Sequence, residues 1–328
     1  MGTCSSIRSL TISLEKENLT YFTDEIICGT ICWNTNGDKI RNQQILLKLI
    51  GEIGFTKNTF QQLEYHHEQF YSIPYPIIKP TDNSSFQGIY SWSFQFPLLN
   101  HLPPTLSKPE FYPHVKYYLY ASIQQSHEKH TKFINVYPRI VLTDNCEYLS
   151  SKIFANYNEI GIILKCTMNR LGFVPGDLIE FMLDIDNPNE FSIEFIDLFI
   201  FQFYEIYSNK SRNMIFHTTL PNIQYLQSKL IADAFSIPIP AIQLPPSTQF
   251  HGGIQTVFTV KQSYQLKFIM KIQNYSSDLQ LDIPIVIATQ IEPCSVEPKS
   301  TTISIVPSAP TLEQILLNDD DDDNDFIH

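Results

Sequence analysis

The stretch that decides the fold is residues 161–207, which read GIILKCTMNRLGFVPGDLIEFMLDIDNPNEFSIEFIDLFIFQFYEIY. Along residues 162–169 apolar side chains alternate with more polar ones, and the alternation returns along 179–186. This period of two is typical of a strand with one buried face. Residues 193–204 form a longer apolar run with weak alternation, so we expect a strand covered on both faces. Because no helical period occurs, the three strands predict an antiparallel meander.

A sharp turn separates the first two of these strands, with the sequence Val174-Pro175-Gly176-Asp177. Proline presets φ for the first central position of a type II turn, and glycine supplies the positive φ that the second position requires. Pro175, Gly176 and Asp177 are therefore predicted to form a structural turn.

The composition favours strands and a sizeable core. The chain has 328 residues, of which 43% are hydrophobic and 13% aromatic, enough for one large core or two moderate ones. Proline outnumbers glycine by 21 to 11, and there are 23 Phe and 17 Tyr, which favours strands and proline-punctuated loops over helices.

Charge and hydropathy exclude some classes of function. Acidic residues outnumber basic ones by 34 to 22, and without a basic stripe we expect no nucleic-acid partner. No run of 18 apolar residues occurs and the N-terminus lacks the apolar core of a signal peptide, so we expect a cytoplasmic protein. In that compartment six cysteines are expected to be reduced thiols. They are Cys4, Cys28, Cys32, Cys146, Cys166 and Cys294.

The second half of the chain repeats the first. Three patterns occur twice in the same order: an acidic residue that opens a strand, a Leu-Pro-Pro corner and a Tyr-x-Leu strand. They lie at 24–27, 96–105 and 117–119 in the first half, and at 177–179, 239–247 and 264–266 in the second. The repeat predicts two tandem β-sandwiches with a related strand order.

This repeat sets the expected domain boundaries. We place the N-terminal sandwich in residues 1–142, a polar linker in 143–158, the C-terminal sandwich in 159–292 and a disordered acidic tail in 293–328. The first sandwich is expected to contain short strands separated by turns. They lie at 10–14, 26–33, 45–50, 90–96, 116–123 and 133–142.

Candidate metal ligands are few. Residues 52–87 are polar and rich in histidine, and we expect a hairpin with long loops that leaves His66 and His67 exposed. Residues 127–130 are one residue short of the HExxH motif of zinc proteases, and Cys28 and Cys32 lack a second ligand pair at zinc spacing. No nucleophile elbow, phosphate loop or acid–base pair occurs either. We therefore predict no metal, no cofactor and no catalysis.

Several segments resemble the arrestin family. Residues 172–179, GFVPGDLI, followed by an alternating strand that ends at Asn187, resemble the start of an arrestin C-domain, and residues 281–288, LDIPIVIA, are similar to its last strand. Four segments look like the matching N-domain, namely 9–14, 24–29, 94–104 and 115–119. The resemblance covers about residues 7–290 and is greatest to the α-arrestins, the arrestin-domain-containing proteins.

The resemblance implies a function. Members of this family are non-enzymatic cytosolic adaptors with two β-sandwiches, and they recognise membrane receptors and transporters. Many of them recruit a HECT-type ubiquitin ligase through Pro-Pro-x-Tyr motifs in the tail. The chain is therefore expected to be an adaptor in ubiquitin-dependent endocytic sorting, located in the cytoplasm and peripherally at the plasma membrane and endosomes.

The tail departs from this pattern. No Pro-Pro-x-Tyr motif occurs, which argues against direct recruitment of a HECT ligase. Instead Pro307, Ser308, Ala309 and Pro310 match the P-[ST]-A-P peptide that the ubiquitin-variant domain of the endosomal complex ESCRT-I captures. The alternative is an ordinary proline-rich exit from the last strand. The aspartate run at 319–325 is expected to be solvated, with a regulatory arm as its alternative.

The N-terminus fits an acylation signal. Met1-Gly2-Thr3-Cys4-Ser5-Ser6 matches the N-myristoylation pattern at Gly2, with Cys4 available for palmitoylation. One acyl chain binds membranes only marginally, so a second at Cys4 would matter for attachment. The alternative is that Gly2 is incidental to the first strand.

Two other functions remain open at this point. Within the same fold, the chain could be a coat component that resembles a retromer subunit. An extracellular Ig-like adhesion protein would also have tandem sandwiches and an even number of cysteines, but it would need a signal peptide.

Overall fold

The computed structural model describes residues 9–35, 44–59, 62–75, 88–124, 127–253 and 257–291. Gly2, Cys4, the 307–310 motif and the aspartate run lie outside the described residues. The described part consists of strands, turns and two short 3₁₀ helices, η1 (Leu142–Asp144) and η2 (Cys146–Leu149), which confirms the all-β prediction. Among these residues no helix has the length and apolar character needed to cross a membrane.

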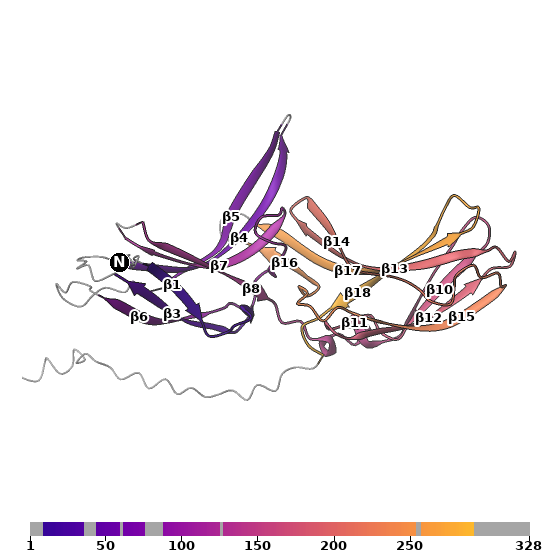
Figure 1. The fold of residues 1–328 in the computed structure, drawn as a ribbon, viewed down its shortest axis with the longest axis horizontal. Helices are drawn as coiled ribbons and strands as arrows, with labels where there is room; N and C mark the ends of the chain where they lie inside the picture. The colour runs from indigo at the N-terminus through magenta and orange to yellow at the C-terminus, as the bar shows by residue number, and fades with distance from the viewer. Residues whose placement is uncertain are drawn as a thin grey trace, which may run out of the picture. The chain divides into compact units, whose positions relative to one another are not determined.

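The first half of the chain forms two sheets (Figure 1). One has three strands in the order β1 (Ser9–Leu14), β3 (Ile26–Asn34), β6 (Ile89–Pro97). The other has five, in the order β2 (Thr20–Phe22), β8 (Lys129–Tyr137), β7 (His114–Ile123), β4 (Ile45–Thr59), β5 (Gln62–Pro74). All pairs are antiparallel except β2 with β8, which is parallel.

The second half also forms two sheets (Figure 1). One has four strands in the order β15 (Leu230–Pro238), β12 (Leu178–Asp186), β10 (Ile163–Met168), β9 (Lys152–Tyr157). The other has six: β11 (Gly172–Phe173), β18 (Leu279–Ile287), β17 (Phe258–Ile272), β13 (Ile193–Ile206) and β14 (Asn209–Thr219) in that order, with β16 (Thr248–Gly252) on β17. Here β11 and β18 form the parallel pair.

The core of the second half lies between its two sheets. Strand alternation directs Cys166 of β10 and Phe181 of β12 inward, where both are almost completely buried. The Phe181 ring contacts Phe268 of the opposite sheet edge to face, with ring centroids 5.3 Å apart. A core of this kind, formed by the inner faces of two sheets, is what the sandwich prediction requires.

The repeat seen in the sequence has a structural counterpart at the Leu-Pro-Pro corners. The hydroxyl of Tyr117 donates a hydrogen bond to the carbonyl of Pro103 at 2.7 Å, and the hydroxyl of Tyr264 donates to the carbonyl of Pro245 at 2.7 Å. Burial raises the pKa of both tyrosines, so both hydroxyls stay protonated and able to donate. Each half thus fixes its corner by the same contact.

The acidic turns repeat as well. The backbone N–H of Leu98 donates to the carbonyl of Glu25, and that of Ile239 donates to the carbonyl of Asp177. In the first half the contact joins the turn before β3 to the residue just after β6, its antiparallel neighbour. In the second half it joins the turn before β12 to the residue just after β15 in the same way. The three sequence echoes therefore mark equivalent places in two related sandwiches.

The predicted three-stranded meander is wrong in its third member. Strands β10 and β12 pair as expected, but β13 pairs with β17 and β14 in the opposite sheet. The chain crosses between sheets at Asn187, whose buried side-chain amide donates to the carbonyls of Phe191 and Ser228. This amide satisfies backbone groups at the crossing, and such a role cannot be recognised from alternation alone.

Two polar segments also form strands that the sequence analysis placed in loops. Residues 52–87 were expected to form a hairpin with long loops. The hairpin is present, but its strands are longer than expected: β4 continues to Thr59 and pairs with the whole of β5. Likewise β9 lies in the expected linker and pairs with β10. Both β5 and β9 are edge strands with largely exposed side chains. Besides backbone hydrogen bonds, only a few apolar side chains hold them: Phe70 and Tyr71 of β5 are buried in the first core, and Phe154 of β9 packs against the second.

We predict that the two corner hydrogen bonds contribute similarly to stability. Tyr117→Phe and Tyr264→Phe each keep the ring but leave a buried proline carbonyl without its donor, which should cost about 1–3 kcal/mol. Urea unfolding measures this difference. Tyr157→Phe, at a side chain that is 75% exposed, is the control and should have no effect. Unfolding free energies of both variants equal to that of the parent would contradict the structural role of the corners.

Candidate functional site

Of the expected site residues, the structure describes only those of the predicted turn, Pro175, Gly176 and Asp177. Gly176 has φ of +93°, and the N–H of Asp177 donates to the carbonyl of Val174 at 3.1 Å, as a type II turn requires. One carboxylate oxygen of Asp177 accepts from the N–H of Val174 at 3.0 Å and from the guanidinium of Arg170 at 2.8 Å. These contacts make it a structural turn that directs β12.

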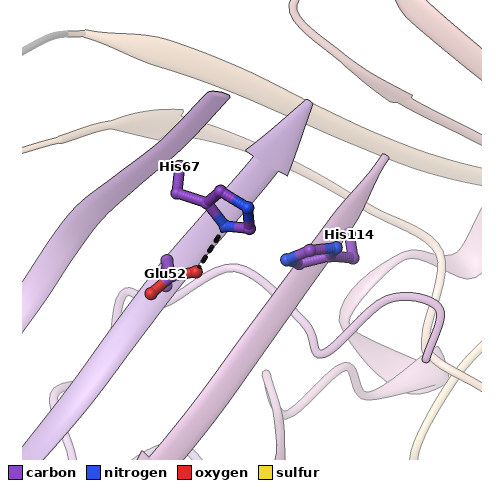
Figure 2. Close-up of side chains that lie close together, drawn as sticks. All are labelled: Glu52, His67 and His114. Carbon is purple, nitrogen blue, oxygen red and sulfur yellow. Dashed lines mark hydrogen bonds and ion pairs between the residues drawn. The ribbon is translucent and has the colours of Figure 1, made fainter. Parts of the chain in front are cut away.

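A polar cluster that the sequence analysis missed lies on the outward face of the five-stranded sheet. Gly54 of β4 pairs with His67 of β5 on one side and with His114 of β7 on the other. Glu52 precedes Gly54 by two positions and therefore shares its face. Figure 2 shows the two imidazole rings and the Glu52 carboxylate close together, and we call these three residues the Glu52–His67–His114 cluster.

Gly54 makes the close approach of the two rings possible. The ring of His114 lies where a side chain at position 54 would be, because a Cβ atom added there would overlap it. The centroids of the His67 and His114 rings are consequently 5.7 Å apart. A glycine inside a strand often marks such an approach, and it is the one signal in the sequence that could have found this cluster.

The proton positions on His114 follow from its surroundings. Its Nδ1 lies 2.8 Å from the carbonyl oxygen of Phe111, and a carbonyl only accepts, so Nδ1 carries the hydrogen. Nε2 then presents its lone pair. The residue is fully buried and this nitrogen has no hydrogen-bond partner. Burial also lowers the pKa of His114, so the ring is neutral near pH 7.

Glu52 is the anion of the cluster. One carboxylate oxygen accepts from Nδ1 of His67 and from Nζ of Lys116, both at 2.7 Å, and the other accepts from the Tyr118 hydroxyl at 3.1 Å. Burial by itself raises the pKa of Glu52, but these three hydrogen bonds outweigh it and the pKa is lowered. The carboxylate is therefore ionised at neutral pH.

His67 links the anion to the loop that precedes β7. Because Nδ1 donates to Glu52, Nε2 accepts a hydrogen bond from the Tyr112 hydroxyl at 2.5 Å. The side chain of His67 is 43% exposed, so the cluster is open to solvent on this side. The prediction that His67 lies on an exposed loop is wrong, because the residue belongs to a paired strand.

A second surface of interest is the outer face of the four-stranded sheet. Cross-strand pairing aligns its outward positions in rows, and many of the side chains are apolar. The large exposed ones are Ile153, Tyr157, Ile163, Leu178, Met182 and Leu230. A single ion pair at 3.0 Å, between Lys165 and Asp184, lies among them. Exposed apolar faces of this kind mark interaction surfaces more often than a scattered apolar residue does.

We predict that Gly54 and His114 are energetically coupled. In Gly54→Ala the new methyl group must displace the His114 ring, and overpacking of this kind costs about 1–3 kcal/mol. In a His114→Ala background the same change should cost much less, because the obstructing ring is gone. A double-mutant cycle of unfolding free energies measures the coupling. Equal costs in both backgrounds would show that the ring does not occupy the space above Gly54.

Comparison with known proteins addresses the identity of the second sandwich. Residues 161–292 match the family model described as arrestin (or S-antigen), C-terminal domain. The matched segment begins just before β10 and ends after β18. No curated protein matches the chain. The α-arrestin subtype remains a prediction, but the match and the all-β fold agree with the resemblance found in the sequence. Residues 161–292 therefore form a domain of the arrestin C-terminal family.

Proposed function

We propose that this chain is a non-enzymatic, α-arrestin-like adaptor that binds membrane receptors or transporters and links them to ubiquitin-dependent endocytic and endosomal sorting. The arrestin C-terminal domain supports an adaptor-like role. The observation that carries the proposal is the apolar outer face of the four-stranded sheet in that domain. An adaptor needs a surface for a partner, and the outward positions of a sheet that serves only as a scaffold are usually polar.

The chemistry of this face suggests the kind of cargo segment. Strand β15 is at the edge of the described sheet, so its outer backbone groups can pair with an added strand. Leu230, Ala232 and Ala234 project outward from it at alternate positions. Lys165 is paired with Asp184 in the middle of the face. Asp186 lies across from Leu230 and adds negative charge next to the β15 edge. An extended cytoplasmic segment with alternating apolar residues and a basic flank fits this surface.

The two ends of the chain supply the remaining parts of the proposal. Gly2 and Cys4 are proposed to carry acyl chains that hold the protein peripherally at the plasma membrane or endosomes. Pro307, Ser308, Ala309 and Pro310 are proposed to recruit the ubiquitin-variant domain of ESCRT-I. A HECT ligase is not proposed as a direct partner, because the chain has no Pro-Pro-x-Tyr motif.

The cargo surface is tested by two variants of equal exposure. Leu230 and Ile89 are both 75% exposed, the first on the proposed face and the second on the three-stranded sheet. In cells, proximity labelling by the full-length protein should mark membrane proteins, and Leu230→Glu should lose them because a charge would be buried against the cargo. Ile89→Glu should retain them.

Both substitutions are at the surface, so unfolding free energies should change by less than about 0.5 kcal/mol. Labelling that is unchanged in Leu230→Glu would remove this face from the proposal. If the parent protein labels no membrane protein at all, the adaptor proposal itself fails. A stable set of coat subunits in place of cargo would favour a retromer-like role.

The tail motif is tested with a peptide of residues 301–318. We expect it to bind the ESCRT-I ubiquitin-variant domain with a Kd of roughly tens to hundreds of micromolar, because an unfolded segment must offset its ordering entropy. Pro310→Ala should abolish binding, whereas Ser308→Thr keeps the motif and should preserve it. Fluorescence polarisation or calorimetry gives the affinities. Binding that survives Pro310→Ala would show that the motif is not recognised.

A further inference from the structure

We propose that Glu52, His67 and His114 bind one divalent transition-metal ion of the zinc class on the outward face of the five-stranded sheet. Nothing in the adaptor function requires this ion, so the inference goes beyond the proposed function. Two imidazoles and a carboxylate are a recurrent ligand set for zinc, which leaves a further coordination position open. One ligand atom from each residue lies within 4.8 Å of the others, and the three come from three neighbouring strands (Figure 2).

His114 is arranged as a metal ligand in the absence of a metal. Histidine ligands typically donate their second N–H to a carbonyl or carboxylate, which fixes the tautomer and the ring orientation. The N–H at Nδ1 of His114 donates to the Phe111 carbonyl, and Nε2 is buried, unprotonated and without a hydrogen-bond partner. A buried acceptor without a donor is unusual in a folded protein. A metal ion would accept this lone pair and explain the arrangement.

His67 can become a ligand by a change of tautomer. In the structure Nδ1 donates to Glu52 and Nε2 accepts from Tyr112. In the other neutral tautomer Nδ1 presents a lone pair on the Glu52 side, and the N–H at Nε2 donates to the Tyr112 oxygen. The number of protons on the ring is unchanged. The Tyr112 oxygen then accepts the second N–H of His67, as the Phe111 carbonyl accepts that of His114. Both histidine ligands thus have a hydrogen-bond partner from the same loop, which fixes their ring orientation.

Lys116 is the group that opposes the metal. Its ammonium lies 2.7 Å from the same Glu52 oxygen that accepts from His67, so a lysine cation neutralises the carboxylate in this structure. A metal ion must take over the carboxylate from Lys116, and it would bind close to a positive charge. The flexible stem of lysine allows the ammonium to swing away, and its removal should strengthen the site.

Metal binding should also stabilise the fold. The ligands join β4, β5 and β7, and their outer partners join the loop before β7 to them. An ion that binds the folded state and not the unfolded chain raises the unfolding temperature. The exposed side of His67 leaves access for water at the open coordination position.

The test uses full-length protein, treated with a chelator, dialysed and kept reduced so that thiols do not form disulfides. Zinc is titrated by calorimetry, and the near-ultraviolet and visible absorption of bound Co²⁺ reports the ligand type, since thiolate ligands add a near-ultraviolet charge-transfer band that imidazole and carboxylate do not. We expect one such ion per chain with no thiolate band, and a higher unfolding temperature when zinc is present.

Three variants separate this site from general binding by histidines. His67→Gln should weaken zinc binding by more than the roughly 10–100-fold that loss of an outer partner costs. His66→Gln is the matched control, because it removes a neighbouring imidazole that stacks on Phe55 outside the cluster, and affinity should not change. Lys116→Met should bind zinc more tightly than the parent protein.

The proposal is overturned if the parent protein binds no zinc, or if His67→Gln binds as well as the parent. It is also overturned if Lys116→Met leaves the affinity unchanged, because Glu52 would then not be a ligand. A failure here leaves the adaptor proposal intact, since cargo labelling and the tail peptide are measured independently.

Discussion

Each sandwich depends on a buried tyrosine hydroxyl that holds a Leu-Pro-Pro corner. The two consecutive prolines lack backbone N–H groups, so the corner cannot be secured by a hydrogen-bond ladder. Tyr117 and Tyr264 solve this problem in the same way, because each reaches from a central strand to the carbonyl of the first corner proline. Each corner lies where the chain passes from one sheet to the other, between β6 and β7 or between β15 and β16. The tyrosine hydrogen bond ties the corner to the second of these sheets, through β7 in the first half and β17 in the second.

In the N-terminal sandwich this constraint also positions the polar cluster. Tyr117 faces the core, so strand alternation turns His114 and Lys116 outward. The corner anchored at Pro103 leads through the loop that carries Phe111 and Tyr112, the outer partners of the two cluster histidines. Core packing on one side of β7 therefore decides the geometry of ionisable groups on the other.

The two sandwiches share inward contacts and differ in their outward chemistry. The outward face of the five-stranded sheet carries two imidazoles, a carboxylate and an ammonium, whereas that of the four-stranded sheet is largely apolar. Outward positions are not constrained by the core, so one fold can present a polar site on one sheet and an apolar docking surface on another.

Local patterns determined much of this structure. Alternation predicted β1, β10 and β12, and segments bounded by turn residues predicted β3, β6 and β7. The Pro175–Gly176 pair predicted its turn, and the repeat predicted two related sandwiches, because each depends on neighbouring residues or on equivalent ones. Tertiary structure alone decided the rest. Asn187 directs β13 into the opposite sheet by satisfying backbone groups that only the fold brings near it. Likewise His67 and His114, distant in sequence, become neighbours because both strands pair with Gly54, which has no side chain to keep the rings apart.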